Sequence, residues 1–192
     1  MFRILSLAIC VGTMASAVSS ATVQWKSSDG GNDHFYELMA GPPITWDSAR
    51  ADAISQGGYL ATITSDAENA FLTALYPTQA WIGGSDAETE GVWKWADGPE
   101  GGNLISYFKW RPGDPNDTNG TQNYLHWLGD DGGQMVDSIT VIGLGTYIVE
   151  WDTDPNIVDP VAPVPVPATL PLLFGSLGVL GFLARRRAQT ER

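Results

Sequence analysis

Two helical patterns lie in the first half of the chain and limit the fold classes that this sequence can adopt. The first runs over 45–58, where Thr45 is placed as an N-cap and a glycine pair ends the pattern. The second runs over 65–77, where Ser65 and Glu68 have the spacing of a capping box and apolar residues follow at helical intervals. The sequence therefore predicts two short, capped helices that are close to each other in the chain.

The rest of the middle of the chain predicts strands and one long loop. The strand-like segments are rich in aromatic and β-branched residues and are bounded by Gly, Asp or Pro: 35–39, 59–63, 80–84, 91–98, 123–128 and 138–151. The long loop, 96–122, is rich in Gly, Pro, Asn and Asp, and a loop of this length in a compact domain is usually functional or disordered. Together these segments predict an α+β fold in which two helices flank antiparallel sheets.

The first 21 residues predict an export signal. Residues 1–21 hold one early arginine, then an apolar run and two small-residue cleavage sites that end at Ala17 and Ala21. Cys10, the only cysteine of the chain, lies inside this segment. The domain predicted to follow, 22–154, therefore has neither a disulfide nor a thiolate ligand for a metal.

The last residues of the chain predict a membrane-sorting segment. Residues 155–167 are a Pro/Val-rich linker, 168–184 are long and apolar enough for a transmembrane helix, and 185–192 form a basic cytoplasmic tail. The Val-Pro-x-Pro-Ala motif at 164–168, followed by the span and the arginines, resembles the sorting signals called PEP-CTERM, in their VPxPA form. The resemblance implies an exported Gram-negative bacterial protein at the cell surface or in the extracellular matrix. It also implies membrane anchoring by this helix unless an exosortase-type sorting protease removes it.

The domain over 22–154 is strongly acidic. Twenty of the chain's 22 acidic residues lie there against five basic ones, so its formal net charge is −15. Such a charge argues against nucleic acid or an anionic lipid surface as a partner. All eight tryptophans of the chain also lie in this domain, which favours a substantial hydrophobic core.

Several phrases in this domain resemble the C-type lectin-like domain. The stretch 35–72 is similar to the family's first strand, first helix, connecting strand and second helix. The stretch 80–98, AWIGGSDAETEGVWKWADG, is similar to its Trp-Ile-Gly and Trp-x-Trp strands, and YIVEW at 147–151 is similar to its closing strand. The resemblance implies the C-type lectin-like fold with a long ligand-binding loop, and it implies carbohydrate or a surface glycan as the partner.

The resemblance also implies a calcium site. In sugar-binding members, side-chain oxygens hold one calcium ion and also bind sugar hydroxyls, and calcium takes 6–8 oxygens with a preference for carboxylates. The family's Glu-Pro-Asn-type triplet corresponds here to Asp114-Pro115-Asn116, which keeps one carboxylate and one amide. The carboxylate that follows in the family corresponds to Gln122, which keeps an oxygen and loses the charge.

The second half of this expected site differs more from the family pattern. The family's Asn-Asp pair corresponds to Val136 and Asp137, and valine offers no side-chain oxygen. Asp131, in the turn before them, could supply the missing ligand if the chain folds accordingly. The implied calcium ligands are Asp114, Asn116, Gln122, Asp131 and Asp137. The implied carbohydrate contacts are Asp114, Asn116, Gln122, Asn123 and Asp137.

Two functions remain open from the sequence. The first is an exported bacterial lectin-like module that binds carbohydrate through the loop at 111–137, with calcium (Ca2+) as its cofactor. The second is a calcium-independent C-type lectin-like scaffold for adhesion to protein or matrix, which Gln122 and Val136 favour. No nucleophile–base or metal–base arrangement is evident in the sequence, so we do not expect an enzyme.

Overall fold

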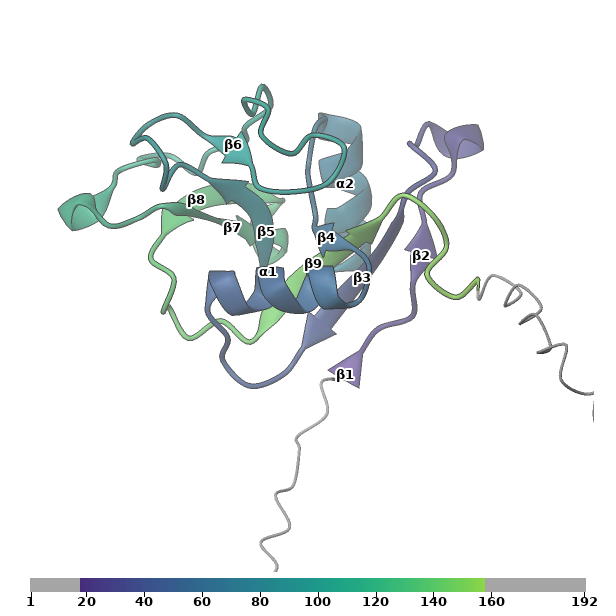
Figure 1. Cartoon of the computed structure of the whole chain (residues 1–192). Coiled ribbons are helices and arrows are strands. Elements are labelled where there is room, and N and C mark those ends of the chain that lie inside the picture. Colours follow the sequence, from purple (N-terminus) through teal and green to yellow (C-terminus); the bar gives the residue numbers. More distant parts are fainter. Residues whose placement is uncertain (1–17, 158–192) are drawn as a thin grey trace, which may run out of the picture. The chain divides into compact units, whose positions relative to one another are not determined.

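One mixed sheet and two helices form the part of the chain that the computed structural model describes, residues 18–157 (Figure 1). The helices are α1, Trp46–Ser55, and α2, Asp66–Leu75. The strands are β1 Val18–Ser19, β2 Val23–Gln24, β3 Phe35–Ala40, β4 Tyr59–Leu60, β5 Gln79–Ser85, β6 Lys94–Trp95, β7 Tyr124–Leu128, β8 Gln134–Ser138 and β9 Thr146–Trp151. Short 3-10 helices lie in the connections: η1 Ser27–Asp29, η2 Thr118–Gly120 and η3 Gly129–Asp131.

The sheet combines antiparallel and parallel pairing. Its strands follow the order β1-β3-β9-β5-β7-β8, and β2, β4 and β6 attach to β3, β9 and β5. The strand pairs are antiparallel except for β5 and β9, which run parallel where Trp81 meets Tyr147. The predicted α+β class with two helices is confirmed, and the predicted antiparallel pairing is wrong at this one pair. Residue patterns that predict strands carry no information on which strands become neighbours, and β5 and β9 are far apart in the chain.

Each helix begins at its predicted N-cap. The Thr45 hydroxyl accepts from the Ser48 N–H at 3.2 Å, and α1 follows it directly. The Ser65 hydroxyl accepts from the Glu68 N–H at 3.2 Å at the start of α2. The predicted capping box is only half formed, because the Glu68 carboxylate accepts instead from the N–H of Thr64 at 2.8 Å.

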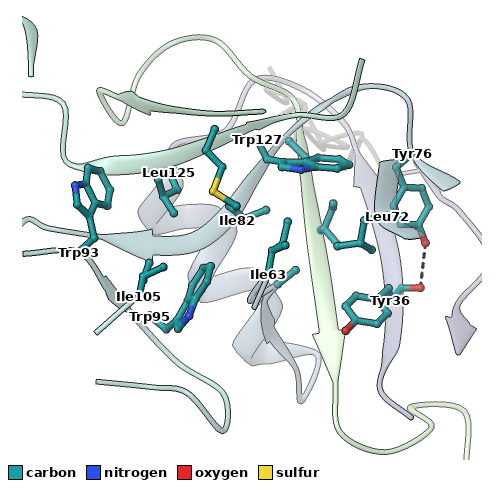
Figure 2. Close-up of a cluster of buried hydrophobic side chains, with 14 of the residues drawn as sticks. Tyr36, Ile63, Leu72, Tyr76, Ile82, Trp93, Trp95, Ile105, Leu125 and Trp127 are labelled. Carbon is teal, nitrogen blue, oxygen red and sulfur yellow. Dashed lines mark hydrogen bonds between the residues drawn. The ribbon is translucent and has the colours of Figure 1, made fainter. Parts of the chain in front are cut away.

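The two helices pack on opposite faces of the sheet (Figure 1). Successive side chains of a strand point to opposite faces, and in β5 Trp81 belongs to the core on the α1 side whereas Ile82 belongs to the core on the α2 side. The α1 side contains Met39, Trp46, Ala49, Ala53, Leu60, Trp81, Tyr147, Val149 and Trp151. The larger cluster on the α2 side includes Tyr36, Ile63, Leu72, Trp95, Leu125 and Trp127 (Figure 2). The tryptophans are therefore shared between two cores that a single sheet separates.

Two hydrogen bonds attach α2 and the residue that follows it to the sheet. The Trp127 indole N–H donates to the side-chain oxygen of Asn69 at 2.7 Å, and both side chains are buried. The Tyr76 hydroxyl donates to the backbone carbonyl of Tyr36 at 3.1 Å (Figure 2). A buried polar atom without a partner costs about 1–3 kcal/mol, so these bonds allow large amphipathic rings to be buried.

Some predicted strands differ in extent from the observed ones. Three are shorter than predicted: β4 ends at Leu60, β6 covers only Lys94–Trp95, and β9 begins at Thr146. The predicted segment 138–151 includes only the last residue of β8, Ser138, whereas the strand begins at Gln134. Its sequence, QMVDS, is short and has little β-branched or aromatic content, so its extended form depends on pairing with β7 rather than on local preference.

The predicted segments at the two ends of the chain fall largely outside residues 18–157. β1 lies within the predicted signal peptide, 1–21, and pairs with the end of β3. Of the two predicted cleavage sites, the one after Ala17 leaves β1 in the mature chain. Between residues 18 and 157, no helix combines the length and the apolar character that crossing a membrane requires. The predicted span at 168–184 lies outside the described residues.

A buried cluster of acidic groups joins β9, α2 and β3. Glu150 is fully buried and Glu68 is 1% exposed. The Tyr36 hydroxyl donates to Glu68 at 2.5 Å, the Thr62 N–H donates to Glu150 at 2.8 Å, and the ring Nδ1 of His34 lies 2.6 Å from a Glu150 oxygen. The hydrogen bond to Glu150 raises the pKa of His34 above its ordinary value of 6.5, and burial raises the pKa of the Glu150 carboxyl.

This cluster makes the stability of the domain depend on pH. Both pKa values are higher in the folded state, so both groups stabilise the fold fully below their unfolded pKa values and lose this contribution as pH rises through the folded ones. We expect the urea midpoint of unfolding to be lower at about pH 8.5 than at about pH 6, with a smaller difference in His34→Gln. A urea midpoint that is higher at about pH 8.5 than at about pH 6 in the unmodified protein would contradict the raised pKa values of His34 and Glu150.

Candidate functional site

An open pocket of about 700 Å³ lies beside the loop formed by residues 111–122, which we call the 111–122 loop. Strands β7 and β8 and the segment 142–144 complete its walls. Its polar wall is formed by Arg111, Asp114, Asn116, Thr118, Gln122 and Asp137. Its apolar side is formed by Leu128, Val136, Ile142 and Leu144. Acceptors, donors and apolar surface therefore meet within one concave space, as in most small-ligand sites.

The face of the β7–β8 pair that lies opposite the α2-side core contributes four residues to the pocket. Leu125 and Trp127 of β7 point into the α2-side core, so the alternate residues of that strand, His126 and Leu128, point to the opposite face. Val136 lies directly across from His126 in the antiparallel ladder, and Ser138 lines the same pocket. The strand register therefore decides which side chains the pocket receives.

Backbone N–H groups attach the 111–122 loop to β8 at two places, the first residue of the loop and the middle of the loop. The Arg111 N–H donates to the Met135 carbonyl at 2.9 Å, which places the first residue of the loop beside the strand. One oxygen of the Asp137 carboxylate accepts from the N–H of Asn116 at 2.9 Å and from the N–H of Asp117 at 2.5 Å. Asp137 is 2% exposed, and its carboxylate is the group that fixes the middle of the loop on the sheet.

The side chain of Asp114 is largely enclosed by its neighbours in the loop. The Asp114–Pro115 peptide bond is cis, and the Asp114 side chain is 3% exposed. Its carboxylate accepts from Arg111 Nε at 2.9 Å on one oxygen and from the Asn116 side-chain amide on the other. The Arg111 guanidinium, which is half exposed, therefore supplies the counter-charge for a nearly buried carboxylate.

The remaining loop oxygens also have partners within the protein. The side-chain oxygen of Asn116 accepts from the Thr118 hydroxyl, and that of Gln122 accepts from the Thr118 N–H. The Gln122 amide donates to the Asp137 carbonyl at 2.9 Å. These bonds link Thr118, at the start of η2, to residues on either side of η2, and they attach Gln122 to β8.

The structure brings together most residues of the predicted site. All five predicted calcium ligands, Asp114, Asn116, Gln122, Asp131 and Asp137, line the pocket. The predicted carbohydrate contact Asn123 is not among the lining residues, and its carbonyl accepts from Ser85 Oγ at 2.8 Å. Arg111, His126 and Ser138 line the pocket without having been predicted. For His126 and Ser138 the alternation of the strands is the signal that could have located them.

His126 is a neutral group at the base of the pocket. Burial lowers the pKa of His126 to about 4, so the imidazole carries no charge at neutral pH. Its Nε2 and the second oxygen of Asp137 are buried and have no hydrogen-bond partner. Unpartnered buried polar atoms are uncommon, and both of these lie in residues that line the same pocket.

The residues present do not fit a calcium ion in the observed arrangement. Calcium needs 6–8 oxygens and binds more tightly as the number of carboxylates rises. Of the carboxylates that line the pocket, those of Asp114 and Asp137 hydrogen-bond to groups of the loop, and Arg111 already pairs with the first of them. Within residues 18–157, no three His, Cys, Asp or Glu side chains come together as a potential metal site. Val136 contributes only apolar surface.

Comparison with known proteins defines the class to which this fold and pocket belong. The family model of the lectin C-type domain matches residues 43–138, half of the chain. The chain therefore belongs to the C-type lectin domain family, whose members are typically non-enzymatic. The matched residues include the 111–122 loop with its Asp114-Pro115-Asn116 triplet.

The similar proteins include one described as a carbohydrate-recognition domain and one described as calcium-independent. Halomucin of Haloquadratum walsbyi is 36% identical over 132 residues, which are 62% of this chain and 1% of halomucin. The C-type carbohydrate-recognition domain of cow CD23, determined in the presence of a GlcNAc2Man3 oligosaccharide, gives a TM-score of 0.54 at 28% identity, over 63% of this chain and 89% of that chain. A calcium-independent type II antifreeze protein gives a TM-score of 0.54 at 26% identity, over 62% and 85%. The chain is thus similar to a carbohydrate-recognition domain and to a protein described as calcium-independent.

The attachment of the loop by Asp137 can be tested directly. In Asp137→Ala the N–H groups of Asn116 and Asp117 lose their acceptor, so we expect unfolding free energy to fall by about 2 kcal/mol. We also expect hydrogen exchange of these two amides to accelerate more than that of the β7 amides. Asp130→Ala, at an exposed carboxylate whose contact is with Gln79, is the control. Equal effects of the two substitutions would contradict the proposed attachment.

Proposed function

We propose that this protein binds carbohydrate in the pocket beside the 111–122 loop. The observation that carries the proposal is the convergence of Asp114, Asn116, Gln122 and Asp137 on one open pocket in a C-type lectin domain. Carboxylate and amide groups are suited to adjacent sugar hydroxyls, because together they accept and donate hydrogen bonds. The similarity to a carbohydrate-recognition domain supports the same function.

The two sides of the pocket suit the two kinds of surface on a pyranose ring. Hydroxyl edges need hydrogen-bonding groups, which the 111–122 loop supplies. The C–H face of the ring needs apolar contact, which Val136, Ile142 and Leu144 supply. Val136 thus has a use in the pocket although it cannot ligate a metal.

The charges around the pocket favour an uncharged sugar. Four carboxylates line it, those of Asp114, Asp130, Asp131 and Asp137, against the single guanidinium of Arg111. Like charges brought together in a partly desolvated site repel each other. We therefore expect neutral hexoses to bind better than sugars that carry carboxylate or sulfate groups.

We propose that this binding takes place outside the cell. The predicted signal peptide at 1–21 and the predicted sorting segment from 155 to 192 support export and surface display, with the basic tail in the cytoplasm until an exosortase-type protease acts. An excess of acidic residues in the domain suits a soluble module in that setting.

Adhesion to protein or matrix is the second candidate function. The observation that favours it is an apolar pair beside the pocket: Val141 is 65% exposed and Ile142 is 39% exposed. Exposed apolar groups at the edge of a pocket are typical of protein-binding surfaces. In this case binding would depend on Val141 and would not be inhibited by free sugars.

A glycan array compared between two asparagine variants tests the first function. Asn116→Ala removes a pocket amide, and we expect affinity for the bound glycans to fall about 10-fold or more, because hydrogen bonds of this kind contribute about 1–3 kcal/mol. Asn103→Ala, at an exposed position outside the pocket, should bind as the unmodified protein does. Equal binding by both variants would place the carbohydrate elsewhere, and no glycan binding by any form would favour the second function.

A further inference from the structure

We infer that the 111–122 loop is formed without calcium, and that the Arg111 guanidinium supplies the positive charge that a metal ion would otherwise bring to Asp114. The inference rests on the proposed function, because it concerns how the same pocket presents its oxygens to a carbohydrate. It concerns the shape of the loop in the free protein, so it can be measured without any glycan.

The negative charge of the Asp114 carboxylate has to be compensated within the protein. Its side chain is 3% exposed, and a carboxylate removed from water needs a counter-charge or several donors. The Arg111 guanidinium provides the counter-charge, with Nε donating at 2.9 Å, and the backbone N–H of Arg111 is itself held by the Met135 carbonyl at 2.9 Å. The guanidinium is therefore positioned by the strand that also carries Asp137.

Most of the oxygens that a metal ion would need already accept hydrogen bonds from the protein. Both oxygens of Asp114, one oxygen of Asp137 and the side-chain oxygens of Asn116 and Gln122 accept from donors in the protein. One candidate oxygen, the second of Asp137, has no partner. A calcium ion would have to replace most of these bonds while repelling Arg111.

At position 136 the wall of the pocket is formed by an apolar valine side chain. Val136 is 5% exposed and lies across from His126, which is neutral because burial lowers its pKa to about 4. Neither side chain adds negative charge to this wall. The pocket thus keeps the shape of a ligand site, but its wall at position 136 offers no oxygen to a divalent cation.

In this pocket the sugar hydroxyls are recognised by side chains that already hold one another in place. Binding should therefore continue when a chelator removes divalent cations. A lectin whose loop depends on calcium loses both the ion and the loop conformation under those conditions.

Thermal unfolding of the purified protein tests the inference. We expect the Tm in about 5 mM calcium chloride and the Tm in EDTA to differ by less than about 1 °C. This calcium concentration would occupy even a weak site of the extracellular type. A saturable increase in Tm with calcium that magnesium does not reproduce would overturn the inference. Calorimetric titration with calcium alone gives the same decision without unfolding.

Two arginine variants test the specific part assigned to Arg111. In Arg111→Gln the Asp114 carboxylate loses its counter-charge, so we expect a lower Tm in EDTA and a recovery of about 2–4 °C in calcium. Arg50→Gln breaks a comparable pair, with Asp97 at 2.5 Å and outside this pocket, and should lose the same Tm in both buffers.

Each outcome bears on one claim. Equal behaviour of Arg111→Gln in calcium and EDTA would show that Arg111 does not stand in for an ion. If this variant does not fold, the unmodified protein in calcium and EDTA still decides the inference. Failure of the glycan array together with a calcium-independent Tm would reject the proposed function and leave the account of the loop in place.

Discussion

The carboxylate of Asp137 is the interaction on which the pocket depends. It accepts the N–H groups of Asn116 and Asp117 from a position on β8 that is 2% exposed. Hydrogen bonds to an ionised group are stronger than neutral ones, and burial strengthens them further. Without this link the 111–122 loop would be attached to β8 only near its two ends, by the Arg111 N–H and the Gln122 side-chain amide, and its middle would lose its contact with the sheet.

The sequence contained enough information for the elements that depend on local chemistry. Both helices begin at side chains that can cap them, Thr45 and Ser65, and the aromatic strands are found where their composition indicates. The elements that depend on pairing were harder to predict. β8 carries little strand preference of its own, and the parallel contact between Trp81 and Tyr147 joins residues that no local pattern connects.

The same distinction applies to the site. Asp114, Asn116, Gln122 and Asp137 were predicted because they correspond to a family motif along the chain, and all four line the pocket. Arg111 was missed, since its pairing with Asp114 depends on how the loop is folded and not on the motif. Asn123 was expected in the pocket, but its carbonyl is held by Ser85 at the end of β5 and the residue is not part of the lining.

We propose that this C-type lectin domain binds a neutral carbohydrate beside the 111–122 loop without a metal ion. The most direct measurement is an NMR titration of the protein with a glycan identified on the array, carried out in EDTA. Our account predicts that backbone amide shifts change in the 111–122 loop and in β8, with the same affinity when calcium replaces EDTA. Shifts confined to other surfaces, or binding that appears only in calcium, would contradict it.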